Sequence, residues 1–348
     1  MNDLYLTGGE GRRTLFLPTA EWHVAKKAVA LRVDAATGKI AERCEYLSPA
    51  DTCADVNPAI TFKAATLWGK RLYTCTSTEV ITFELPAFRR VGYISLPCFN
   101  DLHHVLPTPN GTLIVVVTGL DLVMEITTDG EVLHEWSVVG DDTWSRFSRR
   151  IDYRKVPSTK PHRAHPNFAF LLGDDIWATR CDLKDAVCLT ASGRRIDIPL
   201  SFPHDGHIFG DWIYFTTVDG HIVIANTGSL KVEQVFDLNV IDNHEGRLLG
   251  FCRGVFPLSE TLVWVGFTRL RPTKFAEKLH WIKGTALDGK PTHVALYDLC
   301  AGRCLREIEL AVHGMDLIFS VVALTGADNA DLLAPAAVEG CIEQQAIG

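Results

Sequence analysis

This 348-residue chain lacks several features that mark particular classes of protein. No segment reaches the roughly 18 consecutive apolar residues of a membrane-spanning helix, and the first residues, MNDLYLTGGEGRR, show no apolar segment behind a basic start. Positive charge is in deficit, because 34 Lys and Arg residues face 42 Asp and Glu residues and give a net charge of −8. Affinity for nucleic acid depends mainly on clustered Lys and Arg. We therefore expect a cytoplasmic protein that binds neither membranes nor nucleic acids.

The ten cysteines lack the spacing of a metal or redox site. Cys300 and Cys304 flank the turn residues AlaGlyArg, and no second pair with ligand spacing accompanies them. In a chain of this length without a secretory signal, thiols are mostly reduced and buried. We expect the cysteines to be free and mainly packed in the core.

What the sequence does contain is a repeated unit of four short strands. In the clearest copy, 100–138, apolar runs are separated by the turns ProAsnGly and ThrThrAspGly, and such turns tolerate the positive φ angles of tight hairpins. Similar units recur along the chain at intervals of about 40 to 60 residues, a period typical of β-propellers, whose blades stack around an axis. The sequence therefore predicts an all-β protein with the fold of a six-bladed β-propeller. Seven blades are the alternative if the residues after 324 form a further strand.

We expect the whole chain, 1–348, to form one propeller domain. Its first unit, 14–47, offers only three strands, TLFLPTA, AVALRVDAATG and KIAERCEYL, so that an inner strand is missing. The apolar segment 317–324, LIFSVVAL, is predicted to supply this strand and to close the ring, which removes an exposed sheet edge. The other five blades are predicted at 59–97, 100–138, 164–200, 203–238 and 249–310.

Histidines gather at the predicted inner strands, which line the axis of a propeller. Eight of the 13 histidines lie at or just before such strands. Neutral imidazoles that converge on one point bind Fe, Zn or Mn, and adjacent carboxylates at Asp101, Asp205, Glu245 and Asp316 would orient the rings. The sequence predicts a divalent metal site, with water-bridged structural histidines as the alternative. The predicted ligands are His104, His165, His204 and His313, with His244 as the next candidate.

Two long connections, 139–161 and 268–292, are predicted to lie on the same face as the start of the inner strands. They concentrate Arg, Lys and aromatic residues on an otherwise acidic protein. Such groups hold anions through Arg forks and attract them through the local field, and arginines paired with neighbouring acids are the equally open alternative. We expect a lid over a small anionic or aromatic substrate. The predicted substrate-binding residues are Arg150, Tyr153, Arg269 and Arg271.

Catalytic candidates follow from alignment of the blades on their second strands. This alignment places His104, His204 and Arg253 at nearly equivalent positions, and it places Lys63 at the corresponding position of the second blade. Asp121 falls in a turn on the same face, where it is a candidate metal ligand, a candidate general base or a turn residue. We predict His104, Arg253 and Asp121 as catalytic residues.

The segment HHVLPTPNGTLIVVVTGLDLVMEITTDGEVLHEW, at 103–136, resembles a blade of the arylsulfotransferase-like propellers. Blades of that family share an inner-strand His, a turn with Pro and Gly, and AspGly before a final aromatic residue. The resemblance implies sulfuryl transfer, with a nucleophilic or oxyanion-stabilising role for His104 and for His204 and an oxyanion role for Arg253. AlaHisPro at 164–166 and HisAsp at 204–205 are similar to motifs of carotenoid-cleavage oxygenases, in which four channel histidines hold iron.

Two classes of function remain open from the sequence. The first is a metal-dependent enzyme of the oxygenase or hydrolase/lyase type, with sulfuryl transfer as a further possibility. The second is a non-catalytic propeller that binds a protein or glycan on the face with the long loops. Propellers host both classes, so the fold alone does not decide between them, and the sequence carries no signal for the oligomeric state.

Overall fold

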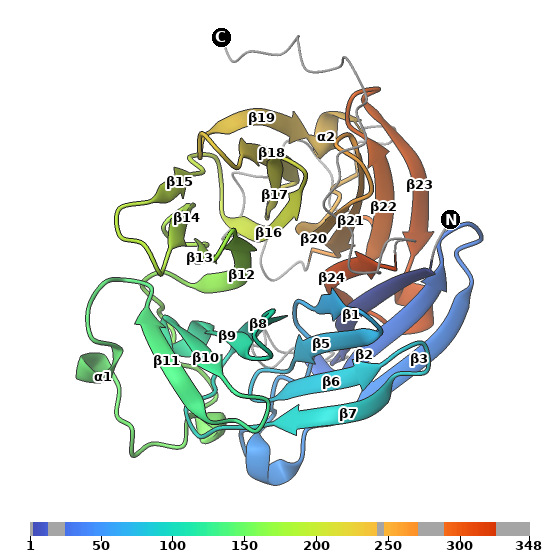
Figure 1. Cartoon of the computed structure of the whole chain (residues 1–348). Coiled ribbons are helices and arrows are strands. Elements are labelled where there is room, and N and C mark those ends of the chain that lie inside the picture. Colours follow the sequence, from blue (N-terminus) through green and yellow to red (C-terminus); the bar gives the residue numbers. More distant parts are fainter. Residues whose placement is uncertain (1–2, 13–24, 242–246, 271–288, 325–348) are drawn as a thin grey trace.

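The computed structural model describes residues 3–12, 25–241, 247–270 and 289–324. Their strands form six four-stranded antiparallel sheets that stand around a central axis (Figure 1). The inner strands β4, β8, β12, β16, β20 and β24 contact one another in that order around the ring, and β24 contacts β4. This arrangement confirms the predicted six-bladed β-propeller.

Blades 1 to 3 come from the two ends and the first part of the described chain. Blade 1 contains β24 (Leu317–Ala323), β1 (Asp3–Gly11), β2 (Ala25–Asp34) and β3 (Ile40–Tyr46). Blade 2 contains β4 (Thr66–Trp68), β5 (Arg71–Cys75), β6 (Val80–Glu84) and β7 (Arg89–Ile94). Blade 3 contains β8 (Leu102–Pro107), β9 (Leu113–Val117), β10 (Leu122–Ile126) and β11 (Val132–Ser137).

Blades 4 to 6 follow in chain order. Blade 4 contains β12 (Pro166–Leu172), β13 (Asp175–Arg180), β14 (Asp185–Cys188) and β15 (Arg195–Asp197). Blade 5 contains β16 (Pro203–Phe209), β17 (Trp212–Thr217), β18 (His221–Asn226) and β19 (Val232–Asp237). Blade 6 contains β20 (Phe251–Pro257), β21 (Leu262–Thr268), β22 (His293–Asp298) and β23 (Arg303–Glu309).

The ring closes through antiparallel pairing of β24 with β1, for example between Leu6 and Val321. This confirms the predicted closing strand near 317–324. The first outer strand differs from the prediction, because β1 begins at Asp3, whereas the predicted strand TLFLPTA falls at 14–20, outside the described residues. The Gly-rich segment of β1 is typical of a loop, but here it allows close strand approach. A Cβ atom on Gly8 would lie 1.8 Å from the carbonyl oxygen of Leu317.

Apolar side chains on both faces of the middle strands fill the spaces between blades. Every residue of β9 is buried, which explains its unbroken apolar sequence. Leu6 and Leu31 of blade 1 pack in one cluster with Trp264 and Leu296 of blade 6. Full burial of such a side chain stabilises the fold by about 1.5–3 kcal/mol, so each blade depends on its neighbours.

Five inner strands carry a β-bulge near their first residues. The register shifts lie at Leu102/His104, Pro166/Phe168, His204/His207 and Cys252/Val255, and a further shift between Thr7 and Gly8 leaves Phe319 of β24 without a paired residue. Bulges turn the strand and redirect a side chain. Here they determine which residues of β8, β20 and β24 reach the axial cavity.

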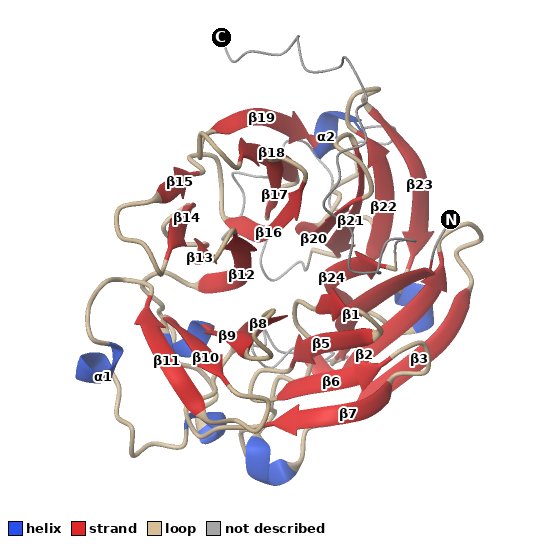
Figure 2. Cartoon of the chain, in the orientation of Figure 1, coloured by secondary structure: helices blue, strands red, loops and turns tan. Residues whose placement is uncertain are grey.

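Helical structure in the described residues is confined to short connections (Figure 2). The α-helical segments are α1 (Thr143–Arg146), between blades 3 and 4, and α2 (Leu238–Ile241), after β19. Within the described ranges, no helix has the length and apolar character needed to cross a membrane. Of the nine described cysteines, Cys53, Cys75, Cys181, Cys188 and Cys252 are buried.

Candidate functional site

A cavity of about 880 Å³ lies where the inner strands of the propeller begin. All six blades contribute to its lining, which mixes imidazoles, cations and apolar side chains. Its volume falls in the range of small-molecule sites. The lining residues used below are Lys63, Asp101, His103, His162, His165, Asp182, His204, Phe251, Arg253, Arg269 and Phe319.

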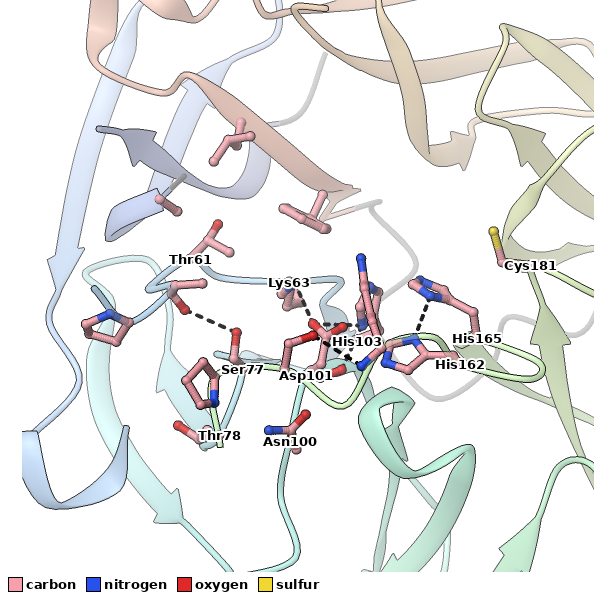
Figure 3. Close-up of a pocket in the computed structure, with 18 of the residues that line it drawn as sticks. Thr61, Lys63, Ser77, Thr78, Asn100, Asp101, His103, His162, His165 and Cys181 are labelled. Carbon is pink, nitrogen blue, oxygen red and sulfur yellow. Dashed lines mark hydrogen bonds and ion pairs between the residues drawn. The ribbon is translucent and has the colours of Figure 1, made fainter. Parts of the chain in front are cut away.

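Lys63, Asp101 and His103 lie next to one another in the lining of this cavity (Figure 3). The Nζ atom of Lys63 lies 3.3 Å from Oδ1 of Asp101, and Lys63 is only 7% exposed. His103 Nδ1 lies 2.8 Å from the backbone carbonyl oxygen of Asp101. Because a carbonyl oxygen only accepts, Nδ1 carries the proton, and a neutral His103 ring has its lone pair on Nε2.

Two further histidines lie beside His103 (Figure 3). The rings of His103 and His165 meet edge to face with centroids 5.0 Å apart. The Nδ1 atoms of His162 and His165 lie 3.0 Å apart, so that one of them donates a hydrogen bond to the other. The three rings therefore form a contiguous imidazole cluster along one side of the cavity.

Two cations approach the ring of Phe319. Lys63 Nζ lies 4.7 Å and the guanidinium carbon of Arg253 lies 4.4 Å from its centroid. Arg253 also lies over Phe251, at 5.3 Å. Cation–π contacts of this kind stabilise a partly desolvated cation. Lys63 of blade 2 and Arg253 of blade 6 therefore lie close to each other, against the same aromatic ring.

Burial and mutual charge set the protonation states of the cluster. Burial holds the pKa of His103 well below its ordinary value and lowers the pKa of His165 to about 3, despite the opposing effect of Asp101. Burial alone would raise the pKa of Asp101, but the charges of Lys63 and the adjacent histidines lower it well below its usual range. At neutral pH the cavity therefore holds neutral imidazoles beside an ionised Asp101.

Asp121, predicted as a catalytic residue, anchors the segment that carries the histidines. Its Oδ1 accepts the backbone N–H groups of Ala164 and His165 at 3.1 and 3.0 Å, and its Oδ2 accepts the N–H of Arg163 at 2.9 Å. Arg146 donates to the same Oδ2 at 3.2 Å. Burial opposes ionisation, but these donors lower the pKa of Asp121 below its ordinary value. The carboxylate thus fixes the backbone of His165. Asp121 itself does not line the cavity.

Three of the predicted metal or catalytic residues, His165, His204 and Arg253, line the cavity, but His104 does not. His104 is fully buried and its ring stacks on Phe168 with centroids 3.8 Å apart. Its Nδ1 accepts the backbone N–H of Ala169 at 3.2 Å, and its Nε2 lies 2.8 Å from Oγ1 of Thr66. Both ring nitrogens therefore have protein partners. The bulge at His103 moves His103 to the position that the sequence prediction assigned to His104.

The remaining predicted ligands do not join His165 and His204. His313 is exposed and lies in the 3-10 turn Ala311–His313, away from the cavity lining. His244 lies outside the described residues. In the part of the chain that the structure describes, no group of three or more His, Cys, Asp or Glu side chains is arranged to hold a metal ion. The proposed set of four histidines is thus not brought together there.

The predicted substrate-binding residues that the structure describes do not all line the cavity. Arg269 lines the cavity and is exposed, whereas Arg150 is exposed without contributing to the lining. Tyr153 is buried, and its hydroxyl oxygen accepts the backbone N–H of Ser148 at 2.9 Å. Arg271 lies outside the described residues.

The long connection before blade 4 forms part of the cavity wall. Asn100 Nδ2 donates to the carbonyl oxygens of Tyr153 and Val156, both at 2.8 Å, and Tyr153 donates its backbone N–H to Pro97 at 2.7 Å. Lys155 forms an ion pair with Asp55 at 2.7 Å. We expected the connection 139–161 to form part of a lid. In the structure its residues 153–156 are held to segments beside blades 2 and 3 by these contacts.

Comparison with known proteins supports the fold and leaves the activity open. The chain matches no known protein family and no curated protein. It is similar in structure to a protein of unknown function from Bacteroides caccae, with a TM-score of 0.59 and 12% identity over 93% of this chain and 99% of that chain. A functionally unknown protein from Desulfotomaculum acetoxidans DSM 771 matches with a TM-score of 0.51 and 10% identity, over the same shares of the two chains. At these identities the likeness concerns the fold alone.

Proposed function

We propose that this protein is an enzyme that acts on a small anionic substrate in the axial cavity. In this proposal Lys63 and Arg253 hold the anionic group and His103 transfers a proton. The observation that carries it is the position of His103, a neutral imidazole of defined tautomer, in one cavity with two cations that contact the same aromatic ring. Such combinations of a base and fixed cations are characteristic of sites that stabilise developing negative charge.

The charges that line the cavity support an anionic ligand. Among the described residues that line the cavity, the cations outnumber the acids, on a chain whose net charge is −8. The cations are Lys63, Arg154, Lys160, Arg253 and Arg269, and the acids are Asp101 and Asp182. His103 and His165 add little positive charge, because burial lowers their pKa values. Local positive charge on an acidic protein attracts anions to one place.

The tautomer of His103 supports a role in proton transfer. Its Nδ1 proton is held by the carbonyl oxygen of Asp101, which leaves Nε2 as the basic atom. In the proposed step, Nε2 takes a proton from a C–H or O–H group, or from water, next to the anionic group. The electron pair of the broken bond stays on the substrate or on the attacking water oxygen, and nearby Lys63 stabilises the negative charge. In a lyase reaction this electron pair forms a new double bond while the leaving group departs with the pair of its own bond. In a hydrolysis it forms the bond between the water oxygen and the substrate, and the leaving group departs with its bonding pair and takes up the proton from His103.

The metal-dependent and sulfuryl-transfer hypotheses have less support from the side chains. The predicted metal ligands are dispersed, and His104, the nucleophile implied by the arylsulfotransferase resemblance, is stacked on Phe168 with both nitrogens occupied. A protein- or glycan-binding propeller without catalysis is the competing class, and it is an outcome of the experiment below.

The proposal is tested by incubation of the protein with pooled carboxylates, phosphate esters and sulfate esters, followed by NMR detection of altered compounds. The expected result is conversion of at least one anion, reduced by about 100-fold or more in His103→Gln, and weaker binding of that anion in Lys63→Met. His134→Gln changes an imidazole that is exposed on β11 and serves as the matched control. Binding without conversion would favour the non-catalytic class. Absence of both binding and conversion would contradict the anion site itself.

A further inference from the structure

Asp205 of blade 5 and Arg253 of blade 6 lie in the β-bulges of two inner strands that contact each other. The register shift covers 205–206 in β16 and 253–254 in β20. Arg253 lines the axial cavity, whereas Asp205 does not. We propose that Asp205 is a positioning residue, which fixes Arg253 where it can hold an anionic group. This inference rests on the proposed anion site and adds to it a residue that acts from behind the cavity wall.

The carboxylate of Asp205 is bonded directly to the bulge of β20. Its Oδ2 accepts the backbone N–H of Gly254, the residue after Arg253, at 2.9 Å. The same oxygen accepts the hydroxyl of Thr216 at 2.6 Å, and the backbone carbonyl oxygen of Asp205 accepts the hydroxyl of Thr179 at 2.6 Å. Asp205 is only 4% exposed. The carboxylate is thus held by blades 4 and 5 and in turn holds the backbone next to Arg253.

The backbone on both sides of this bond has little room to rearrange. Asp205 has a φ angle of +64°, in the left-handed region that Asp tolerates better than most residues. Gly254 has a φ angle of +81°, and a Cβ atom there would lie 3.0 Å from Cα of Ser320 in β24. The bulge of β20 is therefore enclosed between Asp205 and β24. Because a bulge sets the direction of its side chains, this contact determines where Arg253 leaves the strand.

The charge of Asp205 also acts on Arg253. Burial raises the pKa of Asp205 to about 6, and the hydrogen bonds that it accepts and the charge of Arg253 oppose this rise. The guanidinium lies 4.4 Å from the centroid of Phe319 and 5.3 Å from that of Phe251. An ionised Asp205 offsets part of the positive charge of Arg253. We therefore infer that Asp205 contributes to the anion site through the position of Arg253, since a fixed cation binds with little cost of reorganisation.

The experiment is a double-mutant cycle on anion binding by the full chain. Isothermal titration calorimetry measures the affinity for benzenesulfonate, which is permanently ionised, in the unmodified protein, Arg253→Met, Asp205→Ala and the double variant. We expect each single substitution to weaken binding about 10-fold. The double variant should bind within about 2-fold of Arg253→Met, because Asp205 acts through Arg253. Asp211→Ala, in the exposed turn between β16 and β17, is the matched control and should leave the affinity unchanged.

Asp205→Asn distinguishes positioning from a general effect on the fold. Its amide oxygen still accepts hydrogen bonds from Thr216 and Gly254, so we expect it to restore binding to about 3-fold below the affinity of the unmodified protein. The remaining loss reflects the missing charge, and it should also disappear when Arg253 is replaced by Met. An effect that acted only through stability of the fold would be the same with and without Arg253.

The possible outcomes separate this inference from the function on which it rests. Additive effects of Asp205→Ala and Arg253→Met, or unchanged affinity in Asp205→Ala, would overturn the positioning role and leave the anion site intact. Unchanged affinity in Arg253→Met, or no binding of benzenesulfonate to the unmodified protein, would overturn both. Thermal melting identifies any variant that has lost its fold. Asp205→Asn then takes the place of an unfolded Asp205→Ala in the cycle, and unchanged affinity or an additive effect again contradicts the proposal.

Discussion

The backbone N–H of His165 donates to Oδ1 of Asp121 across 3.0 Å, so that a turn of blade 3 holds a cavity histidine that precedes blade 4. The same carboxylate accepts two more backbone N–H groups and Arg146. Asp121→Ala would leave these buried donors without an acceptor. We expect it to lower the free energy of unfolding by about 3 kcal/mol and to displace the His165 imidazole signals in NMR spectra.

Asp121→Asn is the informative companion to this substitution, because its amide oxygen still accepts hydrogen bonds from Ala164 and His165. We expect it to recover about half of the lost stability. Asp129→Ala, in an exposed turn of the same blade, should change stability by less than about 0.5 kcal/mol. An Asp121→Ala protein with unchanged stability and unchanged His165 signals would show that these bonds do not position the loop.

The adjacent residues His103 and His104 should respond in opposite ways to substitution. His104 is fully buried against Phe168 and is hydrogen-bonded on both nitrogens, so we expect His104→Ala to cost about 3 kcal/mol of stability. His103 lines the cavity and its Nδ1 donates to the backbone carbonyl oxygen of Asp101, so His103→Gln should cost about 1 kcal/mol. Urea unfolding measures both. Larger destabilisation by His103→Gln than by His104→Ala would reverse the assignment of cavity and core.

The contrast between these two histidines shows how far the sequence could locate the site. Turn residues and the repeat spacing predicted the blades, because strand length and turn chemistry are local properties. The inner-strand position of the histidines was predicted as well. The direction of each side chain was not, because a single unpaired residue at the bulge of β8 exchanges the two faces of the strand. Alignment of blades on their second strands does not detect such a residue.

Other members of the site were missed for a different reason. Alignment of the blades placed Lys63 at the position that corresponds to His104 but gave it no role, yet Lys63 is buried and paired with Asp101 from the next blade. Phe319 lies in an apolar strand, and such a sequence predicts a residue of the core. Its contacts with Lys63 and Arg253 join segments more than 60 residues apart in sequence. These contacts depend on ring closure and inter-blade packing. Local sequence patterns do not encode them.

Asp205 gives a pH-dependent prediction. It is 4% exposed, it accepts Thr216 Oγ1 at 2.6 Å and the N–H of Gly254 at 2.9 Å, and burial raises its pKa to about 6. The folded state therefore binds a proton that the unfolded state releases between about pH 4 and pH 6. This group's contribution to stability is present below pH 4 and is lost as the pH rises through 6.

Asp205→Asn removes that titration. The stability of the variant relative to the unmodified protein should consequently increase by up to about 3 kcal/mol between pH 4 and pH 7, as measured by urea unfolding across this range. Asp129→Asn is expected to show no such trend, because that residue lies in an exposed turn. A relative stability of Asp205→Asn that does not vary with pH would contradict the raised pKa.

Closure of the ring depends on the absence of a side chain at Gly8. A Cβ atom there would lie 1.8 Å from the carbonyl oxygen of Leu317 and 2.8 Å from its carbonyl carbon, and both are backbone atoms that cannot move without β24. Gly8→Ala should therefore separate β24 from β1 and lower the free energy of unfolding by about 3 kcal/mol or more. Gly228→Ala, in an exposed turn with 3.4 Å to its nearest neighbour, is the control. Faster hydrogen exchange at Val321 and Val322 in Gly8→Ala alone would locate the damage at the closure, whereas equal stabilities of the two variants would show that the ring tolerates a wider gap.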